Sequence, residues 1–460
     1  MAEQALGMGR RIQRLFVADR SLDKKIFLLA WPVAAEMFLQ TLAQMVDMAM
    51  VGRLGQAAIA AVGMSFRPLF VGQAIFLGLG VATTALVARF MGAGDKAKAT
   101  RAAEQSLLTT SVLALALAAF GYYAARHITV FMGATEDVVG LGTSYLKGFS
   151  PGLFFLMLAT IMTSALRAAG DTKTPFYAGA ISNVVNVVGN YILIFGKFGF
   201  PAMGVLGAAI ATSISRVVMA AIQFAVLLKG KGGLHLNWRD FATLDWDMIS
   251  RLFKIGIPAA LERFVQSLSM MLHVKILATL RTTAVAISTL SSNVEQLSFM
   301  PSIGFAVAAS TLVGQNLGAR QPAEAEKSGW GAMRLCSYFM GAMGLLFILI
   351  PSVFIRIYTS DPAVIAPAVP VMRMIGLTQL PQAIAFVSSG VLRGAGDTKA
   401  VLGISVLGNV VLRLGISYLL VIVLQWGLWS AFVAVLIDWV IRGRLMAYWV
   451  KLGKWKTIRV

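Results

Sequence analysis

The chain carries an internal repeat whose two copies are 226 residues apart. Residues 166–173 read LRAAGDTK and residues 392–399 read LRGAGDTK, with seven identities in eight positions. The same offset relates Pro32, Glu36 and Gln40 to Pro258, Glu262 and Gln266. A short motif can recur by accident, but one offset kept from residue 32 to residue 399 indicates two halves with a common fold. We therefore predict an internally duplicated molecule.

The composition indicates a membrane protein. Apolar residues make up 58% of the chain, charged residues 13%, and the mean hydropathy is +0.77. A soluble core of this length could not bury that much apolar surface, so we predict an all-α polytopic membrane protein. Apolar runs predict twelve transmembrane helices, at 26–51, 57–88, 105–126, 138–165, 174–196, 203–228, 252–280, 284–317, 329–355, 363–391, 400–424 and 427–450.

Each half of the duplicated chain is predicted to contain six spans. Because six is even, both halves enter the membrane from the same side, and the repeats are parallel. The expected organisation is a cytoplasmic segment at 1–25, an N-lobe at 26–228, a cytoplasmic linker at 229–251, a C-lobe at 252–450 and a cytoplasmic tail at 451–460.

The net charge of +20 is explained by orientation in a membrane. Most lysines and arginines fall in the termini, the linker and the loops that twelve spans place on the same side as both termini. This bias is typical of cytoplasmic segments that lie against anionic lipid. We therefore expect a multi-pass protein with both termini in the cytoplasm, with the lipid bilayer as a partner and no nucleic acid.

Three predicted spans carry polar residues on one helical face. At about 100° per residue, the polar residues of each span fall within a sector of about 80°. They are Glu36, Gln40, Gln44 and Asp47 in the first span, Glu262, Gln266, Ser269 and His273 in the seventh, and Asn183, Asn186 and Asn190 in the fifth. A carboxylate within a span costs about 2.5 to 3.5 kcal/mol unless it faces water, a partner or a protein interior. We expect these faces to line a cavity, although bonding between helices would also explain a single asparagine or glutamine.

These carboxylates predict antiport chemistry. In a cavity of low dielectric they can take up and release protons, and when ionised they attract an organic cation or Na⁺. A site that holds either a proton or a cation couples the movements of the two. The predicted ion-coupling residues are Asp47, Glu36, Asn186, Asn190 and Glu262; the predicted substrate-cavity residues are Gln40, Gln44, Asn183, Gln266, Ser269, Met270 and His273.

Other polar positions have structural interpretations. In the repeated motif, Gly170 can end one helix and Asp171 can cap the next, which predicts a tight turn; a gating role is the alternative. Asp438 and Arg442, four residues apart, are expected to pair. Glu295 either takes part in coupling or bonds across helices. His273 replaces the aspartate expected from Asp47, as a structural histidine or a proton carrier.

Several motifs together resemble one transporter family. They are Pro32 with Val46-Asp47 and Val51-Gly52, then Val313-Gly314-Gln315 with Leu317-Gly318-Ala319, and the two LRxAGDTK segments. Over nearly its whole length the chain resembles a multidrug and toxic compound extrusion (MATE) transporter of the bacterial DinF and NorM type. The resemblance implies two six-helix lobes around a central cleft, which export amphipathic, mostly cationic drugs in exchange for H⁺ or Na⁺, with no other cofactor.

The resemblance also implies roles for individual residues. Asp47 matches the aspartate that the family uses for coupling, and with Asn186 and Asn190 it is a candidate site for Na⁺. One family branch has an aspartate where this chain has Asn190. Another branch has a glutamate where this chain has Gln266, and the acid here is Glu262, one helical turn earlier.

Two further function classes compete with a drug exporter in the bacterial inner (plasma) membrane, which we expect to be a monomer. A flippase for lipid-linked saccharides or other amphiphiles would need a strongly basic cavity. The candidate arginines for such a cavity are few: Arg67, Arg263 and Arg413. A membrane enzyme would need a motif such as HExxH or GxSxG, and none occurs in the sequence, which has three histidines and one cysteine.

Overall fold

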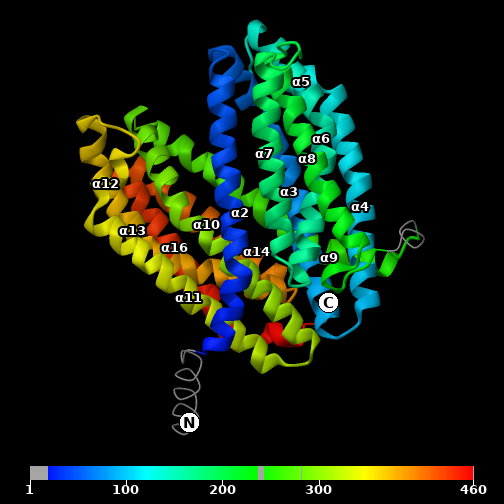
Figure 1. Ribbon diagram of the computed structural model, residues 1–460. Coiled ribbons are helices and arrows are strands. Elements are labelled where there is room, and N and C mark those ends of the chain that lie inside the picture. Colours follow the sequence, from blue (N-terminus) through cyan, green and yellow to red (C-terminus); the bar gives the residue numbers. More distant parts are fainter. Residues whose placement is uncertain (1–18, 237–242, 281, 459–460) are drawn as a thin grey trace. The chain divides into compact units, whose positions relative to one another are not determined.

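The computed structural model describes residues 19–236, 243–280 and 282–458, and within these ranges the chain is almost entirely helical (Figure 1). The first repeat consists of α2 (Arg20–Gly52), α3 (Gln56–Gly92), α4 (Lys96–Tyr123), α6 (Glu136–Ala168), α7 (Lys173–Phe195) and α8 (Gly204–Leu228). The second consists of α9 (Trp246–Ala278), α10 (Thr282–Gly318), α11 (Pro322–Leu349), α13 (Pro362–Gly394), a helix of mixed type over residues 398–423, and α16 (Leu428–Leu452). The predicted all-α fold with two six-helix repeats is confirmed.

The helix boundaries repeat together with the sequence. The pairs α2 and α9, α3 and α10, α4 and α11, and α6 and α13 each begin and end 226 residues apart. The short helices α5 (Ala125–Phe131) and α12 (Pro351–Arg356) also occupy matching places. Most helices extend several residues beyond the predicted apolar runs, because their first and last turns are polar.

The two copies differ most at the fifth helix of each repeat. Helix α7 is a regular α-helix, whereas its counterpart is α14 (Thr398–Val406) followed by the π-helical segments η2 (Leu407–Gly415) and η3 (Leu419–Val423), with α15 (Ile416–Tyr418) between them. In sequence, Leu412 and Ile416 stand where the first repeat has Asn186 and Asn190. The second repeat therefore lacks the asparagine pair of the first.

Among the described residues, ten helices are long and apolar enough to cross a membrane. Helices α9 and α16 are the two long helices outside this set. Both carry charged residues well inside the helix, at Glu262 and Arg263 in α9 and at Asp438 and Arg442 in α16. Charges at these positions call for partners inside the protein.

The chain forms two compact units, residues 35–260 and residues 1–34 with 261–460, of which the ranges given above are described. This division differs from the expected lobes at 26–228 and 252–450, because the first halves of α2 and α9 are exchanged between the repeats. Ile26, Leu29 and Ala30 of α2 belong to the buried core formed by the second repeat. The expected linker also ends early, since α9 begins at Trp246.

Glycines at repeat-related positions permit this exchange. A Cβ atom on Gly78 of α3 would lie 2.4 Å from the carbonyl oxygen of Gly256 in α9. A Cβ atom on Gly304 of α10 would lie 2.4 Å from the carbonyl oxygen of Ala30 in α2. Any larger residue would separate these backbones, so the duplicated glycine serves the same crossing in each unit.

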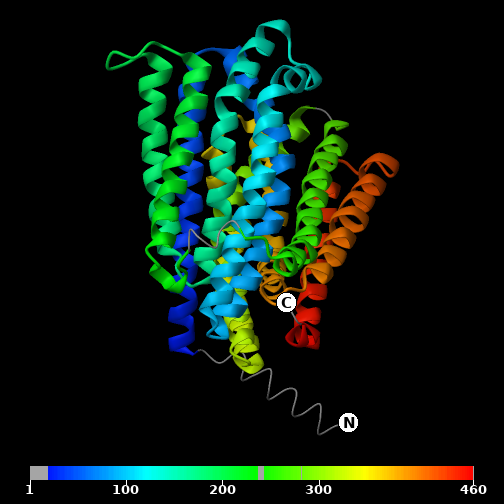
Figure 2. The same ribbon diagram turned by 90° about the vertical axis from the view of Figure 1, so that its right-hand side faces the viewer.

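Helix α6 is central to unit 35–260. It packs against α3, α4 and α8, and α8 packs in turn against α7. Figure 2 shows α4 and α6 side by side. In the other unit, α13 takes the equivalent place and packs against α10, α11 and α16. Large buried side chains, such as Phe149 and Met157 in the first unit and Phe347 in the second, fill the spaces between these helices.

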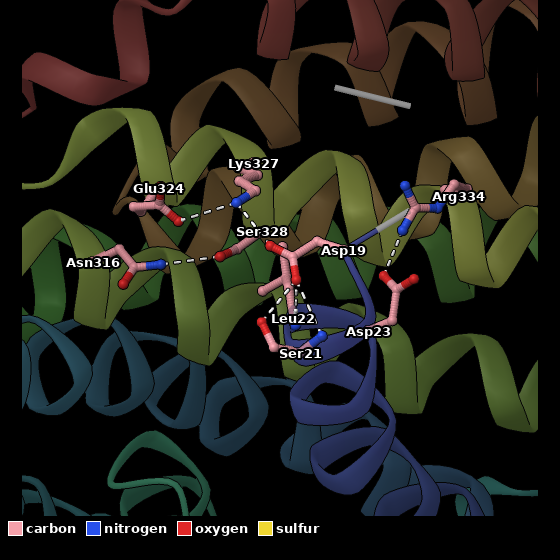
Figure 3. Close-up of polar contacts among 9 residues, drawn as sticks. All are labelled: Asp19, Ser21, Leu22, Asp23, Asn316, Glu324, Lys327, Ser328 and Arg334. Carbon is pink, nitrogen blue, oxygen red and sulfur yellow. Dashed lines mark hydrogen bonds and ion pairs between the residues drawn. The ribbon is translucent and has the colours of Figure 1, made fainter. Parts of the chain in front are cut away.

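The start of α2 is attached to α11 by two ion pairs (Figure 3). Asp19 caps α2 by accepting from the backbone N of Ser21 at 3.0 Å, and Lys327 Nζ lies 2.9 Å from its other carboxylate oxygen. One turn later, Arg334 pairs with Asp23. Hydrogen bonds from Lys327, Ser21 and the backbone N of Leu22 hold the pKa of Asp19 well below its usual range.

The repeated LRxAGDTK motif forms the predicted tight turn in both copies. Gly170 and Gly396 have φ values of 96° and 88°, which favour glycine. Asp171 Oδ1 accepts from the backbone N of Thr174 at 2.9 Å, and Asp397 Oδ1 accepts from the backbone N of Ala400 at 3.3 Å. The aspartate therefore caps the following helix in both repeats.

Candidate functional site

Asp47 lies at the centre of a polar cluster inside unit 35–260. Asn190 of α7 donates from Nδ2 to Asp47 Oδ1 at 2.6 Å. With its amide nitrogen turned toward Asp47, Asn186 donates to Oδ2 at 2.9 Å and to Oδ1 at 2.7 Å. Both asparagines are buried, and they are four residues apart, so both side chains leave the same face of α7.

Three further side chains complete the cluster. Thr212 of α8 lies 3.1 Å from the Asn186 amide and donates to the carbonyl oxygen of Ala208 at 2.8 Å. Arg216, one turn later on α8, and Tyr145 of α6 both interact electrostatically with Asp47. Two amides of α7 thus contact the carboxylate, and a guanidinium of α8 and a phenol of α6 act on it electrostatically.

The donor arrangement suits a carboxyl group that changes its protonation state. Two amide nitrogens stabilise the charged carboxylate by hydrogen bonds. Asn190 Oδ1 is buried and has no hydrogen-bond partner among the described residues. Rotation of this amide by half a turn would present the oxygen to Asp47, as a protonated carboxyl requires. The cluster can therefore satisfy Asp47 in either state.

Glu36 lies in a second polar contact of the same unit, apart from Asp47. Arg167 of the repeated motif donates from Nη2 to Glu36 Oε2 at 2.7 Å. Both side chains are mostly buried, with 17% of Arg167 and 13% of Glu36 exposed. The structure therefore pairs Glu36 with the motif, and it does not bring Glu36 to the asparagines of α7.

Glu262 makes the equivalent contact in the second unit. Arg393 donates from Nη2 to Glu262 at 2.7 Å, and Ser405 lies 3.3 Å from the same carboxylate. Glu36 and Glu262 are repeat partners, as are Arg167 and Arg393. The motif arginine thus has the same acidic partner in both copies.

The other residues predicted on the polar face of the seventh span each contact a different partner and do not form one cluster. Arg263 donates from Nη1 to Gln266 Oε1 at 3.1 Å, and Ser269 Oγ donates to the carbonyl oxygen of Asn409 at 2.7 Å. His273 is buried and its Nδ1 lies 3.2 Å from Ser417 Oγ. Met270 is 57% exposed.

A buried charge cluster occupies the interior of the second unit. Asp438 is fully buried and pairs with Arg442 as predicted, and also with Arg413 of η2, whose Nη2 lies 2.9 Å away. Both guanidinium groups lie over the ring of Trp439, at 5.4 Å for Arg413 and 4.1 Å for Arg442. Glu295 of α10 accepts from Gln382 Nε2 of α13 at 3.1 Å. This is a hydrogen bond between helices, the second of the two roles considered for Glu295 in the sequence analysis.

The remaining predicted cavity residues differ in exposure. Gln40 and Asn183 are partly buried, and Gln44 is exposed. The side chain of Arg67 lies outside the described residues. Within the described ranges, no group of three or more histidine, cysteine, aspartate or glutamate side chains is placed to hold a metal ion.

The sequence analysis missed the arginines that complete these contacts. Arg216 lies in the middle of an apolar helix, and an intramembrane charge is itself a sign of function that should have directed attention to it. Arg167 and Arg393 belong to the repeated LRxAGDTK motif, but the sequence analysis assigned no role to them. Tyr145 and Thr212 gave no sequence signal, because an isolated tyrosine or threonine in a span is common.

Comparison with known proteins decides the family. The MatE family model matches residues 32–192 and 258–419, one segment in each repeat. The chain belongs to the MATE family. It is therefore a transporter and not an enzyme, and the resemblance found in the sequence is confirmed. The two matched segments begin at Pro32 and Pro258, which are themselves repeat partners.

Relatives of this MATE chain are similar over almost their whole length. It is 31% identical to the probable multidrug resistance protein NorM of Thermotoga maritima over 438 residues, which cover 95% of this chain and 93% of the relative. It is 29% identical to the multidrug resistance protein MdtK of Yersinia pseudotuberculosis, with 89% of each covered.

Solved structures share the fold of this MATE chain. A multidrug resistance MATE family transporter in an outward-facing conformation aligns with a TM-score of 0.87 at 23% identity, covering 95% of this chain and 97% of the other. A MOP superfamily transporter from Pyrococcus furiosus, whose binding pocket is described as reversed in polarity, aligns with a TM-score of 0.86 at 24% identity, with the same coverage.

Proposed function

We propose that this MATE transporter exports amphipathic, mostly cationic drugs in exchange for protons. Its relatives from Thermotoga maritima and Yersinia pseudotuberculosis are named multidrug resistance proteins and match nearly the whole chain, which supports drug efflux. We place it in the bacterial inner membrane as a monomer, with both termini in the cytoplasm, because the termini and linker are rich in lysine and arginine.

The observation that carries the proposal is the pair of amides on Asp47. Asn186 and Asn190 hold the carboxylate where it is available to a proton or a cationic substrate. When Asp47 is protonated, the Asn190 amide can rotate so that its Oδ1 accepts a hydrogen bond from the carboxyl group. Protonation removes the charge that attracts a cation, so proton and drug exclude each other. Alternating access then couples proton entry to drug exit.

The same cluster favours H⁺ over Na⁺. In the arrangement described, both asparagines present nitrogen to Asp47, so Na⁺, which takes oxygen ligands, would need both amides to turn, whereas a protonated carboxyl needs only Asn190 to turn. Arg216 adds a positive charge close enough to act on Asp47, and this charge would oppose a metal ion at the carboxylate. A proton bound covalently to the carboxylate needs no further oxygen ligands, and the resulting neutral group is not repelled by the Arg216 guanidinium.

The alternative function, a flippase for lipid-linked saccharides, receives less support from the arginines. Arg413 shares Asp438 with Arg442, and Arg263 interacts with Glu262 and donates to Gln266. Guanidinium groups with acidic neighbours provide little excess positive charge for a pyrophosphate. The drug-export proposal is therefore preferred.

Efflux from proteoliposomes tests the proposal. Ethidium efflux is measured under an imposed pH gradient and then under an imposed Na⁺ gradient, for the native chain, Asp47→Asn and the exposed control Glu136→Gln. We expect efflux driven by the pH gradient, lost in Asp47→Asn and retained in Glu136→Gln. Efflux driven by Na⁺ alone would overturn the choice of ion, and full efflux by Asp47→Asn would overturn the role of the carboxylate.

A further inference from the structure

Arg216 lies in the middle of α8 and has no partner of its own. It is the one charged residue in the sequence of this helix. Its Nε is buried, and its guanidinium forms no hydrogen bond or ion pair with any described residue. A charge inside a span is costly unless a partner or water balances it. The balance for this arginine must therefore come from a group that acts on it without a direct contact.

That group is Asp47. Arg216 follows Thr212 by one turn of α8, so the two side chains leave the same face of the helix. Thr212 lies 3.1 Å from the amide of Asn186, which in turn contacts Asp47. Arg216 acts electrostatically on Asp47 and on Tyr145 of α6. The guanidinium is therefore near enough to balance the carboxylate, but it does not form an ion pair with it.

The second repeat contains the same arginine in a paired form. Arg442 is the repeat partner of Arg216, and Asp438 is the repeat partner of Thr212. Arg442 pairs with Asp438, which lies four residues earlier in the same helix and is fully buried. The second repeat thus fixes its arginine with an acid, at a position where the first repeat has a neutral threonine.

The acid has changed helix between the two repeats. It is Asp47 on α2 in the first repeat and Asp438 on α16 in the second, where His273 stands in the place of Asp47. Asp438 is held by two guanidinium groups, from Arg413 and Arg442, which leaves little room for another cation. Asp47 accepts hydrogen bonds from neutral amides and keeps its arginine at a distance. The first repeat therefore separates a pair of charges that the second repeat joins.

We propose that Arg216 is a positioning residue for the exchange at Asp47: its charge balances the ionised carboxylate while neither a proton nor a drug is bound, and so promotes the release of both. This inference rests on the proposed function. An ionised carboxylate with no positive neighbour would hold the first cation that reached it, since its isolated charge is costly in the interior of the protein.

The charge of Arg216 is constant through the transport cycle, because a guanidinium keeps its proton at physiological pH. The other groups around the carboxylate are the phenol of Tyr145 and the neutral amides of Asn186 and Asn190. Arg216 therefore weakens the binding of a proton and of a cationic drug together. It leaves their mutual exclusion at Asp47 unchanged.

Ethidium binding and ethidium efflux test this role. The dissociation constant is measured by fluorescence titration of the full chain in a neutral detergent, and KM and kcat are measured for efflux from proteoliposomes. The variants are Arg216→Met, which removes the charge, and Arg216→Lys, which keeps it. Arg126→Met is the control, since it removes the same charge from an exposed position on α5 of the same unit.

We expect Arg216→Met to bind ethidium about tenfold more tightly, because a positive charge near the bound cation is lost. KM and kcat should fall together, since a drug that is bound more tightly leaves more slowly. Arg216→Lys and Arg126→Met should stay close to the native chain. Weaker or unchanged binding in a monodisperse Arg216→Met variant would overturn the proposal, and so would an equal change in Arg216→Lys.

Thermal unfolding in detergent compares the two repeats directly. Arg216→Met should melt at or above the temperature of the native chain, whereas Arg442→Met should melt below it because it breaks an ion pair. An equal loss in both variants would show a structural arginine and overturn the proposal. Binding and unfolding need no gradient, so they test Arg216 even if coupled efflux fails, and that failure would overturn the proposed function alone.

Discussion

Arg167 and Glu36 form an ion pair at 2.7 Å that joins the repeated motif to the first long helix. The second copy of the motif repeats this contact between Arg393 and Glu262, also at 2.7 Å. Protonation of either glutamate would remove the ion pair from a mostly buried arginine, which is unfavourable. We infer that these two acids hold helices together, while the exchangeable proton resides on Asp47.

A charge exchange tests this inference. Glu36→Gln should destabilise the protein by about 3 kcal/mol, because it leaves a partly buried guanidinium without its acid. The double variant Glu36→Arg with Arg167→Glu should recover much of the loss. Thermal unfolding, followed by loss of the monodisperse peak in detergent, measures both. Lys98→Gln is the control, since its pair with Asp95 is exposed and is worth about 0.5 kcal/mol.

The transport assay separates the pair from the coupling site. Glu36→Gln should still couple efflux to the pH gradient in whatever fraction of protein remains folded. A stable Glu36→Gln variant that has lost coupling would show that Glu36 carries the proton, as first predicted from the sequence.

Asn190 and Asn183 provide a matched comparison on α7. Both were predicted to face the cavity, but only Asn190 donates to Asp47, at 2.6 Å. Removal of a hydrogen bond to a charged group costs about 1.5 to 3 kcal/mol, so Asn190→Leu should reduce the rate of coupled efflux by about tenfold or more. Asn183→Leu should leave coupling close to native. An equal loss in both variants would mean that the polarity of this face matters more than the contact with Asp47.

Much of the fold was predictable because the sequence patterns that indicate it extend over many residues. Apolar runs and a constant offset located the twelve helices, and the asparagine spacing on α7 placed Asn186 and Asn190 beside each other. The exchange of the first halves of α2 and α9 was not predictable. It depends on close crossings at Gly78 and Gly304, and a glycine in a helix does not reveal its partner.

The candidate site was predictable only in part. Helical periodicity identifies the face that a residue shares, but not the residue opposite it, so Glu36 was grouped with Asp47 although its partner is Arg167. The π-helical segment η2 was not predicted either, because its residues lie within one continuous apolar run. Arg413 on η2 pairs with Asp438, and this contact was not predicted from the sequence.

The lowered pKa of Asp19 should make the stability of the protein depend on pH in a specific way. Hydrogen bonds from Lys327, Ser21 and Leu22 lower its pKa when the protein is folded, so the ionised carboxylate stabilises the native state above the unfolded pKa of about 3.9. This contribution is lost as the pH falls through the lower, folded value. The melting temperature of Asp19→Asn should therefore lie below that of the native chain at pH 7, and the two should converge in acid.

The control for Asp19 is Asp247→Asn, which removes the same charge from an exposed carboxylate that pairs with Arg251 within its own helix. Its melting temperature should follow the native curve at every pH. A constant difference between Asp19→Asn and the native chain from pH 7 to acid would indicate that the cap, and not the charge, is what matters.

Among these variants, substitution of Asp438 should cause the largest loss in the free energy of unfolding. It is fully buried and is shared by Arg413 and Arg442, so Asp438→Asn leaves two guanidinium groups without their acid and should cost about 3 to 5 kcal/mol. Arg442→Met should cost less, because the pair between Arg413 and Asp438 survives and the new side chain can pack on Trp439. Thermal unfolding of both variants in detergent gives the order directly. If Arg442→Met proved the more destabilised of the two, the contact of its guanidinium with Trp439, and not charge balance, would hold this part of the unit together.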